Sequence, residues 1–222
     1  MPTILFEDSL LIAINKPAGM PAQADKTGDR PALQWAGEAC GQDLHPVHRL
    51  DRPASGVLLL AKTKAAMAQL QRQFQAHAVE KEYLAVVSAP PPEAEGTLVH
   101  YLQKNAAKNR AFAAGAPAPD TERAELHYRL LGSSQRYHLV HIRLVTGRHH
   151  QIRAQLAAIG CPIKGDVKYG ARRGNRDRSI HLHAWRLAFE HPGSGEWIEL
   201  QAPLPEGDPV WEAMRSLLEP LA

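Results

Sequence analysis

The sequence predicts a fold of the α+β class, on three observations. Residues 57–61 are a short, continuous apolar run after a Ser-Gly pair, and a run of this length indicates a buried strand. Residues 124–131 and 137–145 show strand patterning around a Gly-Ser-Ser turn, which suggests a β-hairpin. Residues 64–75 place apolar side chains at helical spacing, which predicts an amphipathic helix packed on the sheet.

Length, charge and cysteine content limit the class of protein. With 222 residues, 44% of them hydrophobic, the chain is long enough for one large domain or two small ones. No apolar run approaches the ~18 residues that span a bilayer, and the start lacks signal-peptide features, so we expect a cytoplasmic protein without a membrane partner. Cys40 and Cys161 lack metal-ligand spacing, and the net charge of +3 only weakly indicates an anionic partner.

The N-terminal region opens with two predicted strands, residues 4–6 and 10–15, around a short turn. The run Asn-Lys-Pro-Ala-Gly then ends the second strand, and its Lys16 is placed either to reach a phosphate or to support a neighbouring loop. Residues 21–31 read as a polar loop, and residues 32–40 as a short helix.

A dense polar cluster immediately precedes the apolar strand at residues 57–61. Its members are His48, Arg49, Asp51, Arg52 and Ser55, and we expect them to converge at the edge of the strand. Asp51 lies between two arginines, which favour its negatively charged form. We therefore predict that Asp51 carries the chemistry, although this stretch alone supports a structural Asp in a solvated turn equally well.

The middle of the chain is less informative. Residues 81–87 and 96–102 are predicted strands, and the polar residues 105–121 are interpreted as a long excursion rather than a domain linker. Strands are also predicted at 181–189 and 196–201, and a closing helix at 209–218. His181 and His183 alternate on the first of these strands, but no third ligand follows at a recognisable spacing, so we predict no metal site.

A second informative stretch covers residues 144–160. It reads as a strand, a Thr-Gly turn and a helix ended by Gly160 and Pro162. Its apolar residues share a packed face, while Arg153 lies on an adjoining face that can reach a cleft. A basic, glycine-containing segment follows, which suits phosphate contacts. Its cations are Lys164, Lys168, Arg172, Arg173, Arg176 and Arg178.

Five motifs, in order along the chain, resemble those of the RluA family of RNA pseudouridine synthases. HRLDRPASGVLLLAK resembles the family signature HRLDxxTSG-LLLLAK, and NKPAG and KEY resemble the family's NKPxG and KxY motifs. TGRHHQIRAQL with GCPIKGDVKYG resembles TGRxHQIRxHL…GxPIxGDxxYG, and a late HLHA strand completes the series. The chain departs from the pattern at Ala54, where Thr is usual, and at Gln155, where His is common.

The resemblance implies a single pseudouridine synthase catalytic domain over residues 1–222, with a mixed, mainly antiparallel sheet, a central catalytic cleft and flanking helices. It implies isomerisation of uridine to pseudouridine in a structured ribosomal or transfer RNA, with base flipping and no cofactor. In agreement, the sequence has no dinucleotide fingerprint or P-loop. We expect a monomer without the separate S4-type RNA-binding module of some relatives.

The resemblance also implies roles for single residues. Asp51 matches the catalytic carboxylate, Tyr83 the tyrosine that stacks on the target uracil, and Arg153 the arginine that pairs with the carboxylate. Residues predicted to contact RNA, from the motifs and the basic segment, are Arg49, Arg52, Arg148, His150, Lys164, Lys168, Arg172 and Arg173. Whether Asp51 attacks the sugar or removes a proton from it stays open.

Two other functions use parts of the same pattern. A hydrolase that uses Ser55, His48 and Asp51 is disfavoured, because three such residues on one loop rarely reach triad geometry and no GxSxG elbow is present. A catalytically silent RNA-binding protein would use the same basic residues, and formation of pseudouridine distinguishes it from the enzyme.

Overall fold

The structure is a computed structural model that describes residues 1–221, and these residues form two compact units. The first unit contains residues 1–81 and 183–205, and the second contains residues 82–182 and the chain from 206 onward. Each unit has its own part of the secondary structure and is described by itself. That residues 1–222 act as a single catalytic domain stays a prediction.

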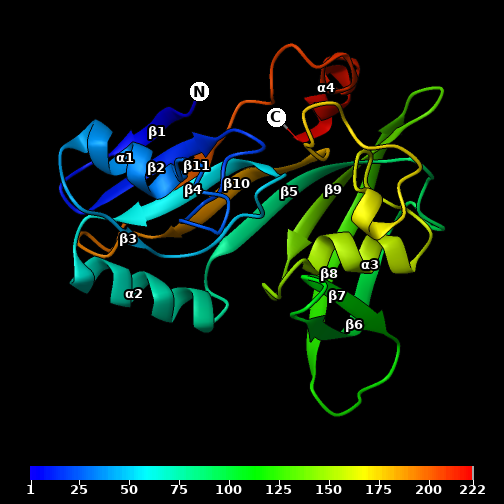
Figure 1. The fold of residues 1–222 in the computed structure, drawn as a ribbon, viewed down its shortest axis with the longest axis horizontal. Coiled ribbons are helices and arrows are strands. Elements are labelled where there is room, and N and C mark those ends of the chain that lie inside the picture. The colour runs from blue at the N-terminus through cyan, green and yellow to red at the C-terminus, as the bar shows by residue number, and fades with distance from the viewer. Residues whose placement is uncertain (222) are drawn as a thin grey trace. The chain divides into compact units, whose positions relative to one another are not determined.

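The first unit is built on a mixed sheet with strand order β1-β2-β4-β10 (Figure 1). The two-residue strand β3 pairs with β4, and β11 pairs with β10. Only β4 and β10 run parallel, and the other pairs in this unit are antiparallel. The strands are β1 (Thr3–Glu7), β2 (Leu11–Lys16), β3 (His45–Pro46), β4 (Ser55–Ala61), β10 (Leu182–Glu190) and β11 (Trp197–Gln201).

Helices α1 (Ala32–Cys40) and α2 (Lys64–Gln75) lie against this sheet (Figure 1). Every residue of β4 is buried, which explains why its sequence is a continuous apolar run rather than an alternating one. The Thr63 side chain caps α2 by accepting a hydrogen bond from the Ala66 amide. Leu70 is fully buried in the core, and Phe74 packs against it, as the helical spacing predicts.

Gly56 fixes how β4 meets its parallel neighbour. Its φ of +114° lies in a region that side-chain-bearing residues rarely adopt. A Cβ atom at this position would lie 2.1 Å from the Ala184 carbonyl oxygen on β10, well inside van der Waals contact. The Ser-Gly pair therefore allows β4 and β10 to pair directly after the polar loop that carries Asp51.

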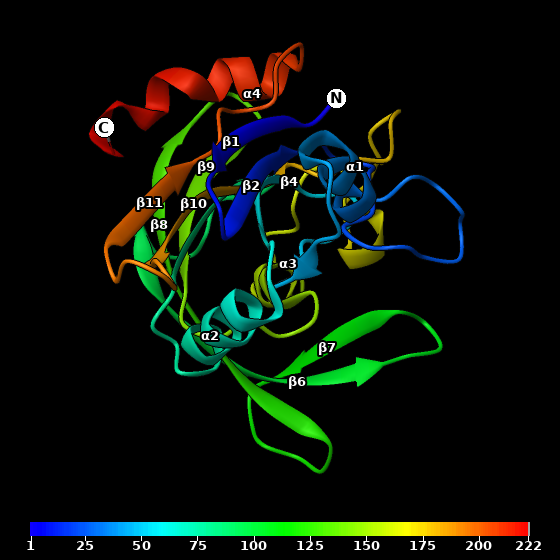
Figure 2. The same cartoon turned by 90° about the vertical axis from the view of Figure 1, so that its left-hand side faces the viewer.

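The second unit contains an antiparallel sheet with strand order β5-β9-β8-β6-β7. Its strands are β5 (Glu80–Val87), β6 (Glu95–Asn105), β7 (Arg110–Ala114), β8 (Thr121–Ser133) and β9 (His138–Leu144). Figure 2 shows the β6–β7 hairpin extending as a narrow two-stranded arm. Helix α3 (Gln151–Ala158) packs against β6 and β7, and the 3₁₀ segment η1 (Val167–Tyr169) follows it. The chain ends with α4 (Pro209–Met214) and the 3₁₀ segment η2 (Arg215–Leu221).

The predicted α+β class with a mixed, mainly antiparallel sheet is confirmed. Two details of the prediction are wrong. The excursion at 105–121 contains a strand, β7, which pairs with β6 over residues 110–114. The expected turn at residues 132–134 begins too early, because Gly132 and Ser133 still pair with Leu139 and His138 of β9 after a register shift between Leu130 and Gly132. The chain reverses at 134–137, where the Ser134 amide donates to the Tyr137 carbonyl. None of the helices within residues 1–221 is long and apolar enough to cross a lipid bilayer.

Candidate active site

The loop of residues 48–54, here called the HRLD loop, connects β3 to β4 in the first unit. The Ala54 amide donates a 3.0 Å hydrogen bond to the Asp51 carbonyl, which closes a turn and fixes the backbone of the carboxylate-bearing residue. Asp51 itself is partly exposed, whereas Leu50 and Ala54 on either side are buried. The loop thus holds a carboxylate at the surface on a backbone anchored in the core.

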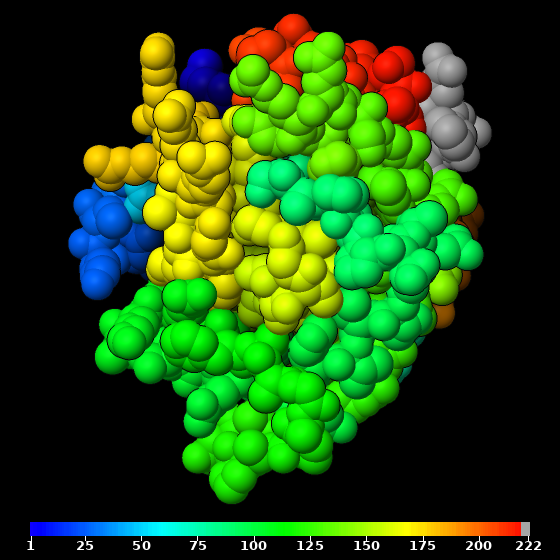
Figure 3. Space-filling view, turned by 90° about the vertical axis from the view of Figure 1, so that its right-hand side faces the viewer, coloured from blue at the N-terminus to red at the C-terminus, as the bar shows by residue number. Residues whose placement is uncertain are grey.

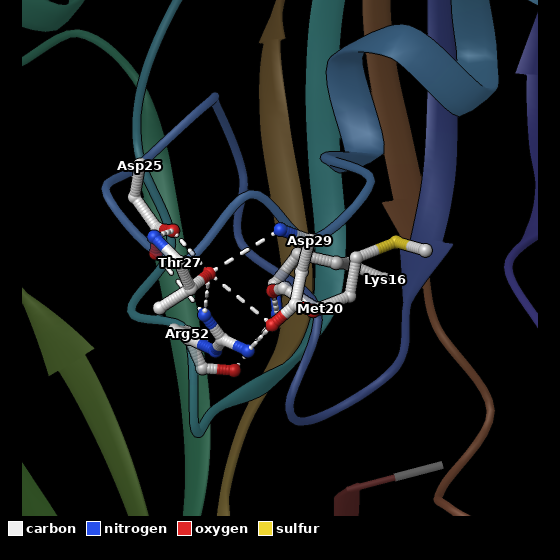
Figure 4. A network of polar contacts seen from close by, with 6 residues as sticks. All are labelled: Lys16, Met20, Asp25, Thr27, Asp29 and Arg52. Carbon is white, nitrogen blue, oxygen red and sulfur yellow. Dashed lines mark hydrogen bonds and ion pairs between the residues drawn. The ribbon is translucent and has the colours of Figure 1, made fainter.

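Lys16 is the main anchor of this loop. Its side chain is 0% exposed, although lysine is rarely buried to this degree. The ammonium donates to carbonyl oxygens of the HRLD loop, at 2.7 Å to Ala54 and 3.3 Å to Arg52. It also donates to the Pro17 carbonyl at 2.9 Å and to the Met20 carbonyl at 2.8 Å, the latter drawn in Figure 4. Of the two roles left open for Lys16, the structure shows loop support.

Electrostatics also link Lys16 to Asp51. Burial lowers the pKa of Lys16 to about 7, and the negative charge of Asp51 opposes this shift. The NKPxG motif therefore contributes both hydrogen bonds and charge to the HRLD loop.

Arg52 points into a polar network with the loop before α1 (Figure 4). Its guanidinium donates to Thr27 Oγ1 at 2.6 Å and to Asp25 Oδ2 at 3.2 Å, and it forms an ion pair with Asp29. These carboxylates raise the pKa of Arg52 above its ordinary value. Arg49, the other arginine predicted to contact RNA from this loop, is exposed.

His48 and Ser55, two members of the disfavoured hydrolase triad, each have a partner outside that triad in the first unit. His48 stacks on Phe74 with a ring-centroid distance of 5.1 Å, and its Nε2 accepts a hydrogen bond from the Leu59 amide. Ser55 is buried, and its hydroxyl lies 2.8 Å from Nδ1 of His183. Since both side chains are engaged with the sheet, they hold the loop in place and do not activate a nucleophile.

Burial of His183 makes the stability of the protein acid-sensitive. Its side chain is 0% exposed, and burial lowers its pKa from 6.5 to about 4, so the unfolded chain binds a proton more tightly than the folded one. The stabilisation is complete above pH 6.5 and is lost as the pH falls through 4. We expect the free energy of unfolding to decrease over this interval by about 3 kcal/mol on account of His183.

Urea unfolding between pH 7 and 4 tests this expectation. The variant His183→Asn should show a shallower dependence of unfolding free energy on pH than the wild type. His77→Asn is the matched control, because His77 is exposed and its positive φ of 57° is one that Asn tolerates. Equal pH dependence in the wild type and His183→Asn would contradict the assignment.

Tyr83 lies on β5 in the second unit, opposite Ile142 of β9, and is partly buried. Its neighbour Glu82 is also fixed, because its carboxylate lies 2.8 Å from Nε2 of His141. The KxY motif therefore places the tyrosine on a central, well-paired strand rather than on a mobile loop.

Arg153 is held by a partner that the sequence analysis missed. It lies on α3, is 4% exposed, and donates from Nε and Nη2 to the two carboxylate oxygens of Asp166 at 2.6 and 2.9 Å. The ring of Tyr169 lies 4.9 Å from its guanidinium carbon. The signal was present, since Asp166 and Tyr169 are the fixed positions of the GDxxYG motif. The predicted pairing of Arg153 with Asp51 stays a prediction.

Tyr169 also connects the start of α3 to the β6–β7 arm. Its hydroxyl lies 2.9 Å from Nδ1 of His150 and accepts a 2.7 Å hydrogen bond from the Ala111 amide of β7. His150, which was predicted to contact RNA, is only 8% exposed. The contact that the structure shows for it is the one with the Tyr169 hydroxyl. Arg148 is exposed and forms an ion pair with Glu122 at 2.6 Å.

The two departures from the family motifs both concern buried side chains. Ala54, the last residue of the HRLD loop, is fully buried, and its carbonyl accepts a hydrogen bond from Lys16. Gln155 is also fully buried, and its amide donates to the carbonyls of Leu98 on β6 and Ala124 on β8 at 3.1 and 3.2 Å. Gln155 therefore joins α3 to the sheet rather than contacting RNA. Residues 151–156 of α3 are all buried, and the expectation that one side of this helix reaches a cleft stays a prediction.

The basic segment after α3 divides into two sets. Lys164 is partly buried and donates to Asn175 Oδ1 at 2.8 Å, and together with the exposed Arg172 and Arg173 it lines a pocket of the second unit. Lys168 instead donates to the Asn109 carbonyl at the tip of the β6–β7 arm, at 3.1 Å. Figure 3 shows this segment, coloured yellow, on the surface of the protein. Contact of these cations with RNA stays a prediction.

The two histidines of the HLHA motif have separate partners. His183 contacts Ser55 and the Ala202 carbonyl, while Nε2 of His181 lies 3.1 Å from Asp208 and its ring stacks on Trp211. Within residues 1–221, no group of three or more His, Cys, Asp or Glu side chains is placed to hold a metal ion.

Comparisons with known proteins agree with the motifs. A family profile described as RNA pseudouridylate synthase matches residues 10–158, which include the HRLD loop, Tyr83 and α3. The chain is 41% identical to an uncharacterized RNA pseudouridine synthase of Chloroflexus aurantiacus, over 86% of this chain and 62% of the relative. It is 37% identical to the tRNA pseudouridine synthase C of Haemophilus ducreyi, over 95% and 93% of the two chains.

The relatives differ in length, and their names refer to different classes of RNA. The chain spans less than two thirds of the Chloroflexus relative, and 65% of the ribosomal large subunit pseudouridine synthase C of Vibrio parahaemolyticus, to which it is 33% identical. Among solved structures, the chain is similar to human RNA pseudouridylate synthase domain containing 4, with 26% identity and a TM-score of 0.75 over 91% of this chain and 88% of that one. Human RNA pseudouridylate synthase domain containing 1, at 24% identity and a TM-score of 0.77 over 98% and 87%, shares the fold.

Proposed function

Because this chain belongs to the RNA pseudouridylate synthase family, we propose that it isomerises uridine to pseudouridine in RNA with Asp51 as the catalytic carboxylate. The observation that carries the proposal is the set of contacts that anchors the loop bearing Asp51. The HRLD loop is tied to the core by Lys16, whose buried ammonium donates to the loop carbonyls and interacts electrostatically with the carboxylate. A rigid, charged carboxylate at the surface is what the reaction requires.

The reaction breaks the bond between the sugar and N1 of uracil and forms a bond between the sugar and carbon 5. The proton on carbon 5 leaves, and N1 gains one, so that substrate and product have the same composition. Two routes use a carboxylate: attack on the sugar carbon, or removal of a sugar proton to give a glycal. In either route Asp51 is the group that acts on the sugar, and no redox step is involved.

The remaining catalytic roles are part of the proposal. A uracil in a structured RNA must leave its stack, at a cost of a few kcal/mol, before the carboxylate reaches its sugar. Tyr83 would stack on the flipped base, and Arg153 would orient Asp51 through a charge-assisted hydrogen bond. The rigid settings of Tyr83 on β5 and of Arg153 against Asp166 support these roles, because fixed groups lose little conformational freedom when the substrate binds.

Residues exposed on the HRLD loop and the basic segment would hold the RNA backbone. Arg49 and Arg172 illustrate the two locations, since both are exposed cations. The substrate would be a structured transfer or ribosomal RNA, the two classes that the names of the relatives contain. We further propose that residues 1–222 act as a single, monomeric catalytic domain in the cytoplasm. The free thiols of Cys40 and Cys161 are consistent with a reducing compartment.

The proposed function is tested with RNA that carries tritium on carbon 5 of uracil. Purified protein is incubated separately with labelled bulk tRNA and with ribosomal RNA, without added cofactor. We expect tritium release in proportion to pseudouridine recovered from nuclease digests of one of the two pools. RNA binding without pseudouridine in either pool would instead indicate the catalytically silent RNA-binding protein.

A further inference from the structure

A pocket of about 460 Å³ lies within the second unit, and only part of it was anticipated. It is formed where the chain after β5, the β8–β9 turn and the basic segment come together. Its lining consists of Ser88, Arg136, Tyr137, Lys164, Gly165, Ala171, Arg172 and Arg173. Three segments that are far apart in sequence thus contribute to one hollow.

The charge of this lining is entirely positive. Four of the eight lining residues are Lys or Arg, and none of the described residues that line the pocket is Asp or Glu. The Lys164 ammonium is fixed by a neutral partner, Asn175, and lies 5.7 Å from the centre of the Tyr137 ring. Burial lowers the pKa of Lys164, and the negative charges of Asp208 and Asp177 only partly oppose this shift. Cations that are gathered without an acid among them favour an anionic ligand.

The β8–β9 turn is shaped to present its residues to the pocket. The Ser134 amide donates to the Tyr137 carbonyl at 2.8 Å, and the Tyr137 amide donates back to the Ser134 hydroxyl at 3.1 Å. This double closure of a four-residue turn fixes Arg136 and Tyr137 beside a basic segment that begins 28 positions later, at Lys164. Sequence patterning gave Arg136 no role.

Not every cation of the basic segment belongs to the pocket. Lys168 is bound to the Asn109 carbonyl, and Arg176 and Arg178 are exposed but absent from the lining. The pocket therefore includes Arg136 from outside the basic segment, while half of that segment's six cations lie outside its lining. That the whole segment tracks RNA phosphates stays a prediction.

We propose that this pocket binds a backbone phosphate of the RNA substrate, with Arg136 as a phosphate ligand beside Lys164, Arg172 and Arg173. The inference rests on the proposed function, which supplies RNA as the partner. Arginine forks match phosphate oxygens in bidentate geometry, and the volume is that of a site for a nucleotide-sized group rather than a lone ion. The lining also includes the uncharged residues Ser88 and Gly165.

The variant Arg136→Gln tests the pocket independently of catalysis. Its affinity for fluorescently labelled bulk tRNA is measured across a salt series. A lost phosphate contact should weaken binding and flatten the slope of log affinity against log salt by roughly 0.7 to 0.9. Arg172→Gln should give a similar change. Arg129→Gln is the matched control, because Arg129 is an exposed arginine of β8 outside the pocket, and its slope should equal that of the wild type.

Two further measurements distinguish free phosphate from RNA phosphate as the ligand, and failure of the pocket proposal from failure of the proposed activity. If inorganic phosphate stabilises the wild type against thermal unfolding while Arg136→Gln keeps the wild-type salt slope with tRNA, the pocket is a site for free phosphate and the inference is overturned. An unchanged slope in an enzyme that forms pseudouridine also overturns it. If the slope flattens as expected but no pseudouridine forms in any RNA pool, the pocket stands and the proposed activity fails.

Discussion

Asp51→Asn is expected to lower the rate of pseudouridine formation by about a thousandfold or more, while RNA affinity stays within a few-fold of the wild type. The substitution keeps the size of the side chain but removes the negative charge that either catalytic route uses. The local backbone should persist, because the Asp51 carbonyl and the Ala54 amide, not the carboxylate, close the turn. The measurement is the single-turnover rate at saturating RNA, together with binding and thermal unfolding of the same variant.

The matched control is Asp43→Asn, which makes the same chemical change at an exposed carboxylate outside the HRLD loop. This control should retain the wild-type rate. In Asp51→Asn the pKa of Lys16 should fall further, because loss of the Asp51 charge removes the interaction that raises it. Turnover by Asp51→Asn within tenfold of the wild type would remove Asp51 from the chemistry, whatever its effect on folding.

The elements that sequence reasoning predicted best are those whose signals are local. Helix α2 has a side-chain N-cap at Thr63 and apolar residues at helical spacing, and its observed bounds are those expected. Helix α1 also spans the expected residues. Strand β4 was predictable because burial on both faces of the sheet leaves a continuous apolar run in its sequence.

The elements that were missed depend on distant partners. Strand β7 has the sequence Arg-Ala-Phe-Ala-Ala, which contains no β-branched residue, and it is a strand because it pairs with β6. The polar residues of α3 are buried because Asp166 and the carbonyls of Leu98 and Ala124 satisfy them. No periodicity of the helix itself reveals such partners.

The candidate site shows the same division. The motifs predict Asp51, Tyr83 and Arg153 as site residues, but they do not specify which groups support Asp51. Lys16 is buried only because carbonyls from residues 17, 20, 52 and 54 meet at its ammonium, and two of these lie 36 and 38 positions away. The same holds for Arg136, whose role depends on a turn that faces a loop from another part of the chain.

Arg153→Met is expected to destabilise the protein by about 3 to 5 kcal/mol and to lower the single-turnover rate at least about a hundredfold. The loss of stability follows from Asp166, which is 1% exposed and would keep a buried negative charge without its bidentate partner. The loss of rate follows from the proposed orientation of Asp51 by the guanidinium. A single variant does not separate the two effects.

The double variant Arg153→Met with Asp166→Leu separates them. Removing both charges leaves apolar side chains beside the Tyr169 ring, and replacing a buried ion pair in this way is often neutral for stability. The backbone hydrogen bonds of Asp166, from its amide to Ile163 and to its carbonyl from Tyr169, do not depend on the side chain. Urea unfolding should therefore return most of the way to the wild-type free energy, while the single-turnover rate stays low. Recovery of the rate together with stability would show that Arg153 serves only to hold Asp166, and that orientation of Asp51 comes from Lys16 and the HRLD loop.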